Sequence, residues 1–261
     1  MKKFLLFTFM TVMILAFTAC SSEEDRPVLI MGTSADFPPF QFVADPGQGV
    51  IGQYAGIDLS LVKRIADELG FDIVVQDQEF GGLLLALQTG SIDFIASGMT
   101  IRPDRAEVVN FSVPYFDAVQ YVIVNSNSIN INSVADLAGL RVGVQLGTTA
   151  DISLTDNHND GTVVLDIIRY NRPVAGVMDV MGGSIDAFVI DAPVARGFAA
   201  QYPDRLRIFS DSDFFGLEQF GMAFNQNNPE LLAQFNSVLS RLVAEGYVDS
   251  LYIHYTGLLE N

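Results

Sequence analysis

The chain has 261 residues, 49% hydrophobic and 17% charged, which is the composition of a well-packed globular protein and excludes a largely disordered one. Its 14 Lys and Arg residues against 31 Asp and Glu residues give a formal net charge of −17 at pH 7. A field of this sign disfavours nucleic acids and anionic membrane surfaces as partners, because both need clustered positive charge.

The first 20 residues have the pattern of an export signal. Two lysines precede an apolar run over 4–17, and this run is shorter than the roughly 20 residues of a transmembrane helix, so a permanent span is the weaker alternative. Cys20 is the single cysteine, so no internal disulfide is expected. It follows small residues at the expected cleavage point and resembles the lipidated cysteine of the bacterial lipobox. We expect a signal peptide over 1–19 and a lipidated tether over 20–27.

From Pro27 onward, strand and helix patterns alternate in chain order. "PVLIMGTS" (27–34), "FDIVVQ" (71–76) and "SIDFIASG" (91–98) predict strands. "GGLLLALQTG" (81–90) predicts a short helix that ends at a glycine. "GIDLSLVKRIADELG" (56–70) predicts an amphipathic helix, because one face carries apolar residues four positions apart, namely Ile57, Leu61, Ile65 and Leu69.

The same order returns in the second half of the chain. It predicts strands over 141–147, 162–167 and 185–191, and helices over 148–154, 172–183 and 192–202. The segment 227–255 is then expected to be long and helical, with an apolar stripe formed by Leu231, Phe235, Leu239 and Leu242. Two similar units of alternating strands and helices predict an α/β fold with mainly parallel sheets.

Six motifs occur in an order that is typical of one protein family. They are "GTSADFPPFQF", "GIDLSLVKRIADELG", "FGGLLLALQTGSIDFIASGMTIRPDRAEVVNFSVPYF", "VGVQLGTT", "IDAFVIDAP" and "EQFGMAF". With them the chain, from about residue 28 to 257, resembles the bacterial extracytoplasmic solute-binding proteins of the polar amino-acid type (family 3), the receptors of ABC importers.

The resemblance implies a periplasmic-binding-protein-like fold of type II, in which two α/β lobes are joined by a two-strand hinge. The crossing segments are expected near 116–119 and 216–220. Lobe 1 would contain 28–116 and 220–261, and lobe 2 would contain 117–219 with the hinge strands.

Arg105 is the residue that the resemblance assigns to the α-carboxylate of a ligand. A planar guanidinium suits a carboxylate, because it donates two parallel hydrogen bonds. Ser97, Gly98 and Thr100 offer backbone and hydroxyl groups nearby, at the end of a predicted strand, where open α/β sheets bind ligands. The alternative for Arg105 is a solvated helix residue that pairs with Glu107 or Asp104.

Asp191 is the residue that the resemblance assigns to the ligand's ammonium group, from the other lobe. Its alternative is structural, since Asp before Ala-Pro is a good helix N-cap. The resemblance places Phe37 and Phe80 over the ligand side chain. At a helix N-terminus, Thr148 and Thr149 offer a second contact with the carboxylate, although an ordinary turn also explains them and Thr149 is the less secure of the two. Gln145 and Ser34 suit a polar side chain.

These features predict a monomeric, extracytoplasmic, lipid-anchored receptor that binds a free amino acid, basic ones first and glutamine next, and delivers it to the membrane permease of an ABC importer. No cofactor, metal or enzymatic activity is expected, because the chain lacks hydrolase and phosphate-loop motifs, and His158 and His254 stand alone. Two alternatives stay open. One is an enzyme similar to cyclohexadienyl dehydratases, for which Glu218 and Glu79 are the candidate acids. The other is a sensory ligand-binding protein, although no signalling domain follows.

Overall fold

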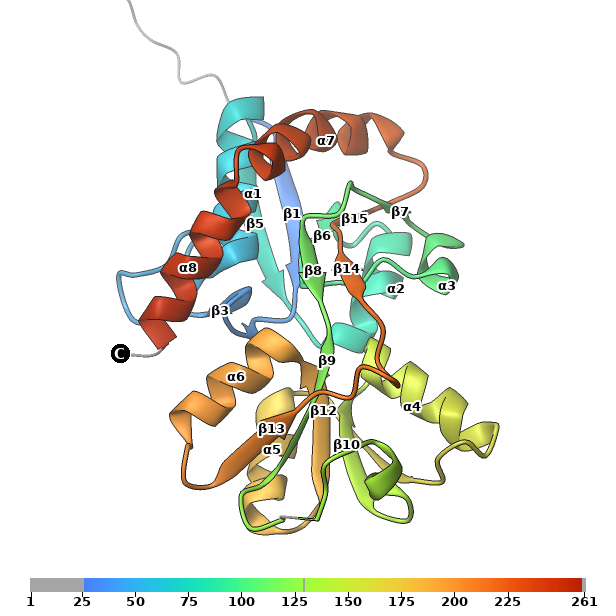
Figure 1. Cartoon of the computed structure of the whole chain (residues 1–261). Helices are drawn as coiled ribbons and strands as arrows, with labels where there is room; N and C mark the ends of the chain where they lie inside the picture. Colours follow the sequence, from blue (N-terminus) through green and yellow to red (C-terminus); the bar gives the residue numbers. More distant parts are fainter. Residues whose placement is uncertain (1–25, 129, 260–261) are drawn as a thin grey trace, which may run out of the picture.

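Two lobes, each built around a five-stranded sheet, make up the fold of this computed structural model, which describes residues 26–128 and 130–259 (Figure 1). The expected signal peptide and Cys20 lie outside the described residues. Within these ranges no helix has both the length and the apolar character needed to cross a bilayer.

The first sheet contains strands from both ends of the described chain. Its order is β5-β1-β6-β15-β7, with β1 at Val28–Thr33, β5 at Asp72–Asp77, β6 at Phe94–Ile95, β7 at Asn110–Phe111 and β15 at Ala223–Phe224. β1 is parallel to β5 and β6, whereas β15 is antiparallel to β6 and β7. The chain that returns from the second lobe therefore completes the sheet of the first.

The second sheet is formed by the middle of the chain. Its order is β11-β10-β12-β9-β13, with β9 at Gln120–Asn125, β10 at Arg141–Gln145, β11 at Asp166–Tyr170, β12 at Ala187–Asp191 and β13 at Leu206–Phe209. β10 is parallel to β11 and β12, and β9 is antiparallel to β12 and β13. The prediction of mainly parallel sheets was therefore wrong for half of the strand pairs in each five-stranded sheet. The strand expected over 162–167 begins only at Asp166.

Two short antiparallel strands connect the lobes. β8 (Phe116–Ala118) pairs with β14 (Glu218–Phe220), and Figure 1 shows both between the upper lobe, which holds the first sheet, and the lower lobe, which holds the second. β8 leads the chain into the lower lobe, and β14 leads it back. The rings of Phe116 and Phe220 stack with their centroids 5.8 Å apart. A third small sheet, β2-β3-β4, belongs to the upper lobe and consists of Asp36–Phe37, Gln41–Val43 and Tyr54–Ala55.

The helices follow the predicted apolar patterns. α1 covers Ile57–Leu69, buries three of the four predicted stripe residues and ends at Gly70 in the left-handed conformation. The others before the C-terminal segment are α2 (Leu83–Gln88), α3 (Pro103–Ala106), α4 (Thr149–Asn159), α5 (Pro173–Gly182) and α6 (Ala192–Gln201).

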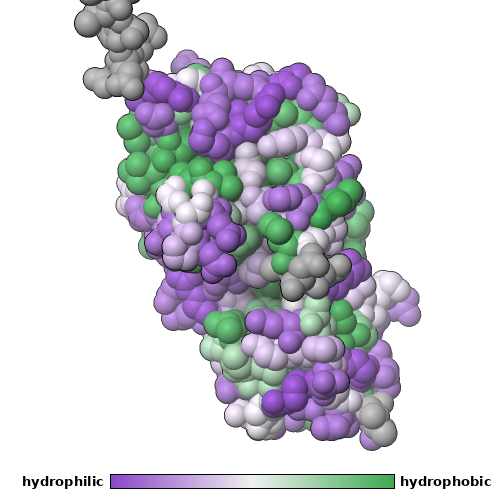
Figure 2. Space-filling model, turned by 90° about the vertical axis from the view of Figure 1, so that its left-hand side faces the viewer, coloured by the Kyte–Doolittle hydropathy of each residue, from purple (hydrophilic) through white to green (hydrophobic). Residues whose placement is uncertain are grey.

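The C-terminal segment forms two helices rather than one. α7 (Pro229–Ala244) buries the whole predicted stripe, and α8 (Tyr247–Leu259) follows after a break. Gly246, with φ of 72°, lets the chain turn there. Both helices pack on α1 of the upper lobe (Figure 1). Figure 2 shows hydrophilic residues spread over both lobes, with smaller apolar patches between them, as the acidic composition leads one to expect.

Candidate ligand-binding site

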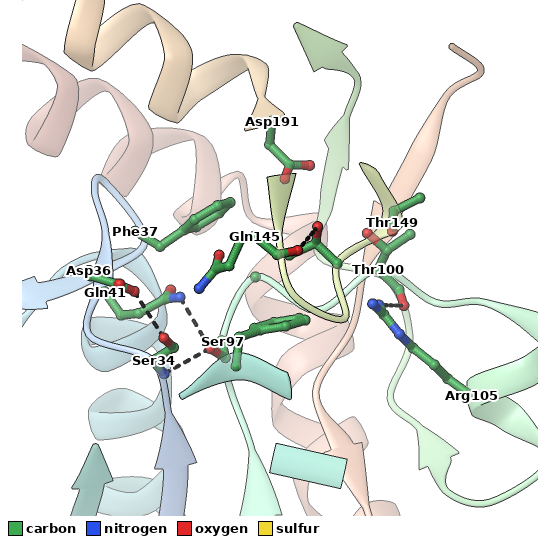
Figure 3. Close-up of a pocket in the computed structure, with 13 residues that line it drawn as sticks. Ser34, Asp36, Phe37, Gln41, Ser97, Thr100, Arg105, Gln145, Thr149 and Asp191 are labelled. Carbon is green, nitrogen blue, oxygen red and sulfur yellow. Dashed lines mark hydrogen bonds between the residues drawn. The ribbon is translucent and has the colours of Figure 1, made fainter. Parts of the chain in front are cut away.

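A single pocket between the lobes contains all eleven residues that the sequence singled out for ligand binding (Figure 3). The upper lobe contributes Ser34, Phe37, Phe80, Ser97, Gly98, Thr100 and Arg105, and the lower lobe contributes Gln145, Thr148, Thr149 and Asp191. Asp36 and Gln41 complete the lining. The site thus joins strand ends and helix starts from both lobes.

Arg105 is buried in the short helix α3, with 3% of its surface exposed. Its guanidinium donates hydrogen bonds to two backbone carbonyl oxygens, from Nη1 to Thr100 at 2.8 Å and from Nη2 to Gly147 at 3.0 Å. It also lies over the ring of Phe80, 5.6 Å from the centroid. Burial lowers the pKa of Arg105 to about 10, so the side chain stays protonated at neutral pH.

The alternative reading of Arg105, a solvated residue paired with a neighbouring acid, is wrong. Asp104 pairs instead with Arg102, at 2.9 Å. In the part of the chain that the structure describes, the Arg105 guanidinium has hydrogen bonds to carbonyl oxygens but no ion pair with a carboxylate. A cation held by neutral acceptors is a suitable partner for a carboxylate ligand.

Asp191 stands at the end of β12 and at the N-cap position of α6, but its side chain makes no capping hydrogen bond. Its Oδ1 instead accepts a hydrogen bond of 2.9 Å from Nε2 of Gln120. Burial, followed by the nearby negative charge of Glu218, raises the pKa of Asp191 well above its usual value. The side chain points into the pocket rather than toward the helix start, as Figure 3 shows.

Glu218 lies beside this carboxylate, on the connecting strand β14. Its Oε2 accepts hydrogen bonds from Oγ1 of Thr100 at 3.0 Å and from Nε2 of Gln120 at 3.2 Å. Burial raises its pKa as well. Gln120 therefore bridges two carboxylates from different elements. Glu79, the other acid singled out in the sequence, does not line this pocket and accepts a hydrogen bond from Asn171.

The two threonines at the start of α4, both expected to contact the ligand carboxylate, differ in their hydrogen bonds. Thr148 is the N-cap residue: its hydroxyl accepts from the backbone N–H of Asp151 at 3.4 Å and donates to the carbonyl oxygen of Gln145 at 2.7 Å. The hydroxyl of Thr149 is buried and has no hydrogen-bond partner within the described ranges. Thr149, judged the less secure from sequence, thus has the hydroxyl that remains available to a ligand.

The opposite end of the pocket is a cluster of small polar groups in the upper lobe (Figure 3). Oγ of Ser97 accepts hydrogen bonds from the backbone N–H of Ser34 at 3.0 Å and from Nε2 of Gln41 at 3.2 Å. Oγ of Ser34 donates to Oδ1 of Asp36 at 2.9 Å. The amide oxygen of Gln41 is buried without a hydrogen-bond partner among the described residues. This end therefore presents acceptor oxygens.

The sequence did not assign three residues here: Asp36 and Gln41, which line the pocket, and Gln120, which donates to Asp191. Gln41 and Gln120 each interrupt a short apolar run, within "FQF" and "AVQYVIV", and both are 1% exposed. A polar side chain in a strand expected to be buried needs a partner, and that need was the available signal.

Gly98 is fixed by a buried carboxylate that does not reach the pocket. Asp58, in the first turn of α1, accepts hydrogen bonds of 2.8 Å from the backbone N–H of Gly98 and from the hydroxyl of Tyr115. Gly98 has φ of 54°, and a Cβ there would lie 3.0 Å from the ring of Phe37. Asp58 thus supports the pocket wall from behind.

Replacing Asp58 with asparagine should flatten part of the pH dependence of stability. Burial raises the pKa of Asp58 to about 7, against about 3.9 in an unfolded chain. Between these values the folded state binds more protons, so the free energy of unfolding should fall as pH rises, by about 1.4 kcal/mol per pH unit. Asparagine cannot titrate. Urea unfolding of both proteins at pH 5 and pH 7 measures the difference, and identical pH slopes would contradict the assignment.

No group of three or more His, Cys, Asp or Glu side chains suited to a metal ion occurs in the described part of the chain. His158 accepts a backbone hydrogen bond from Leu165, and the ring of His254 packs on that of Tyr255. Both contacts are structural.

Comparison with known proteins gives consistent matches over the described chain. Residues 29–258 match the model of the bacterial extracellular solute-binding proteins, family 3. The arginine-binding extracellular protein ArtP of Bacillus subtilis is 33% identical over 259 residues, covering 96% of this chain and 96% of that protein.

Solved structures agree with this match. A mutant of ArgBP from T. maritima is 37% identical, with a TM-score of 0.78, over 88% of this chain and 95% of that chain. The ancestral amino acid-binding protein AncCDT-1, a precursor of cyclohexadienyl dehydratase, is 34% identical, with a TM-score of 0.77, over 88% and 95% of the two chains. The fold class predicted from sequence is confirmed, and the chain belongs to family 3 of the bacterial extracellular solute-binding proteins.

Proposed function

We propose that the protein is an extracytoplasmic receptor that binds a free amino acid between its lobes and delivers it to the permease of an ABC importer. One observation carries this proposal: Arg105 of one lobe and Asp191 of the other line the same pocket with opposite charges. The α-carboxylate of a zwitterion would bind the guanidinium, and its ammonium group would bind the aspartate.

The acceptor-rich end of the pocket suggests the class of ligand. Asp36, the amide oxygen of Gln41 and the hydroxyl of Ser34 offer oxygens to a side chain that donates hydrogen bonds. An arginine or lysine side chain supplies donors with a positive charge, and glutamine supplies a neutral amide. We therefore place arginine first, then lysine, then glutamine. The name of ArtP, an arginine-binding protein, supports the first place given to arginine.

Closure of the lobes would link binding to transport. We propose that 28–116 with 220–261 moves as one body against 117–219, about the paired strands β8 and β14. A zwitterion reaches both charged groups only when the lobes are closed, so its binding shifts the equilibrium toward the closed form. The closed form would then dock, as a monomer, on the permease.

A thermal-shift screen of the mature protein against the twenty common amino acids tests this function. A ligand at 100 times its Kd should add about 2.7 kcal/mol to the free energy of unfolding, which raises the Tm by roughly 5 to 10 °C for a domain of this size. We expect the largest shift with L-arginine. The absence of a shift with all twenty would overturn the proposal.

Binding without catalysis, and without a cofactor, is part of the same proposal. The alternative enzyme needs a general acid in the cleft, and Glu218, the candidate acid, contacts the pocket residue Thr100 but does not itself line the pocket. Its oxygen is engaged by Thr100 and Gln120, and the charge pair for a zwitterion is intact. Incubation with prephenate discriminates the two, because product formation would support the enzyme.

Cys20 carries a separate proposal about localisation. We propose that cleavage before Cys20 leaves a lipidated N-terminus that holds the receptor on the outer side of a membrane. The supporting observation is the n-region, apolar run and small residues that precede this cysteine. Mass spectrometry of the mature N-terminus tests it: a diacylglyceryl cysteine is expected, and an unmodified residue there would exclude the anchor.

A further inference from the structure

Arg172 of the lower lobe crosses the gap to two carboxylates of the upper lobe. It precedes α5, and its Nη1 lies 3.5 Å from Oδ2 of Asp36 and 3.3 Å from Oδ1 of Asp77. The side chains of Arg172, Asp36 and Asp77 are 34%, 17% and 26% exposed. The three charges therefore meet at the partly buried margin of the pocket.

Both carboxylates are held in place independently of Arg172. Asp77 accepts a 2.9 Å hydrogen bond from the backbone N–H of Ala35, and Asp36 accepts one of 2.9 Å from Oγ of Ser34. Asp36 also lines the pocket itself. The upper lobe alone thus presents two fixed negative charges at the acceptor-rich end, and the lower lobe supplies one positive charge.

We propose that Arg172 sets how strongly the receptor discriminates between cationic and neutral ligand side chains, an inference that rests on the proposed function. When the lobes close, Arg172 neutralises one of the two carboxylate charges beside the ligand side chain. One negative charge is left for a cationic group. Because Arg172 belongs to the opposite lobe, its charge reaches the two carboxylates only when the lobes are closed.

The contacts around Arg172 make this role separable from closure itself. Asn171, its neighbour, donates a 2.8 Å hydrogen bond to Oε1 of Glu79 across the same gap. Arg105 reaches the carbonyl oxygen of Gly147 across the pocket. Removing the charge of Arg172 therefore leaves other contacts between the lobes. A general loss of closure would lower the affinity for all ligands equally, whereas a charge effect changes the ratio of the affinities for cationic and neutral ligands.

Calorimetric titration with L-arginine and L-citrulline tests the proposal, because citrulline has nearly the same shape without the charge. Arg172→Gln should raise the ratio of the citrulline Kd to the arginine Kd by about fivefold over the wild type, the scale expected for one partly exposed charge. Arg172→Lys keeps the charge and should leave the ratio near that of the wild type. Asp36→Asn should lower it.

Arg64→Gln is the matched control, since it removes the same charge from an exposed pair with Glu68 on α1. Its ratio should equal that of the wild type. A uniform loss of affinity for both ligands in Arg172→Gln, with an unchanged ratio, would overturn this proposal alone. A wild type that bound neither ligand would overturn this proposal and the first place given to arginine, whereas the proposed receptor function fails only if none of the twenty amino acids raises the Tm.

Discussion

Replacing Arg105 with alanine should raise the Kd for the best amino-acid ligand by roughly 10² to 10⁴-fold. Two charge-assisted hydrogen bonds contribute about 1.5–3 kcal/mol each, and their loss leaves the ligand carboxylate in a pocket without its cation. Isothermal titration calorimetry measures the change. Wild-type affinity in the variant would show that the carboxylate binds elsewhere.

Arg105→Lys separates charge from geometry at this position. Lysine keeps the positive charge but not the planar fork, so we expect an affinity between those of the wild type and the alanine variant. Arg102→Ala is the matched control: Arg102 lies three residues away, pairs with Asp104 and does not line the pocket. It should bind as the wild type does. Equal losses in both alanine variants would indicate a general effect of charge.

The sequence predicted best those helices and strands whose formation depends on residues close together in the chain. α1 shows this, because the four-residue apolar spacing and the terminal Gly70 are both local features, and both appear in the structure as a buried face and a left-handed cap. The stripe of α7 was predicted for the same reason. Strand position in the lower sheet was less certain, since "TVVLDI" suits a strand as well as the residues that follow it. Long-range pairing with β10 selects Asp166–Tyr170.

Strand direction and the break between α7 and α8 are two further features that the sequence did not predict. β15 is antiparallel because the chain re-enters the upper lobe from the connecting strand, a path that no local pattern contains. Gly246 did signal the break, but an apolar stripe continues on both sides of it and concealed the end of α7.

The motifs predicted which residues line the site, but they did not predict the hydrogen bonds between these residues. All eleven residues line one pocket, yet the sequence could not tell which threonine caps α4, because both Thr148 and Thr149 suit that position. The φ and ψ values of the turn decide it. Asp191 gave the opposite case: it occupies a cap position, but its side chain turns to Gln120, a residue 71 positions away. Contacts of that range depend on the complete fold.

Replacing Asp191 with asparagine should weaken amino-acid binding by about 10² to 10³-fold, because the ligand ammonium loses its charged partner while the shape of the side chain is kept. Asparagine still offers an oxygen to Gln120, so the bridge to Glu218 is retained. Asp166→Asn, on the exposed start of β11, is the matched control and should bind normally. Calorimetry that gave wild-type affinity for Asp191→Asn would refute the assigned role.

The titration of Asp191 gives this prediction a second readout. Its raised pKa means that Asp191 in the unliganded site keeps its proton to higher pH than an ordinary aspartate does, and an ammonium group favours the ionised form. Binding should therefore release a proton, and wild-type affinity should rise as pH rises through the raised pKa. Titrations in two buffers of different ionisation enthalpy measure the release. Asp191→Asn should abolish most of it, whereas equal release in both proteins would assign the proton to another group, with Glu218 as the neighbour to replace next.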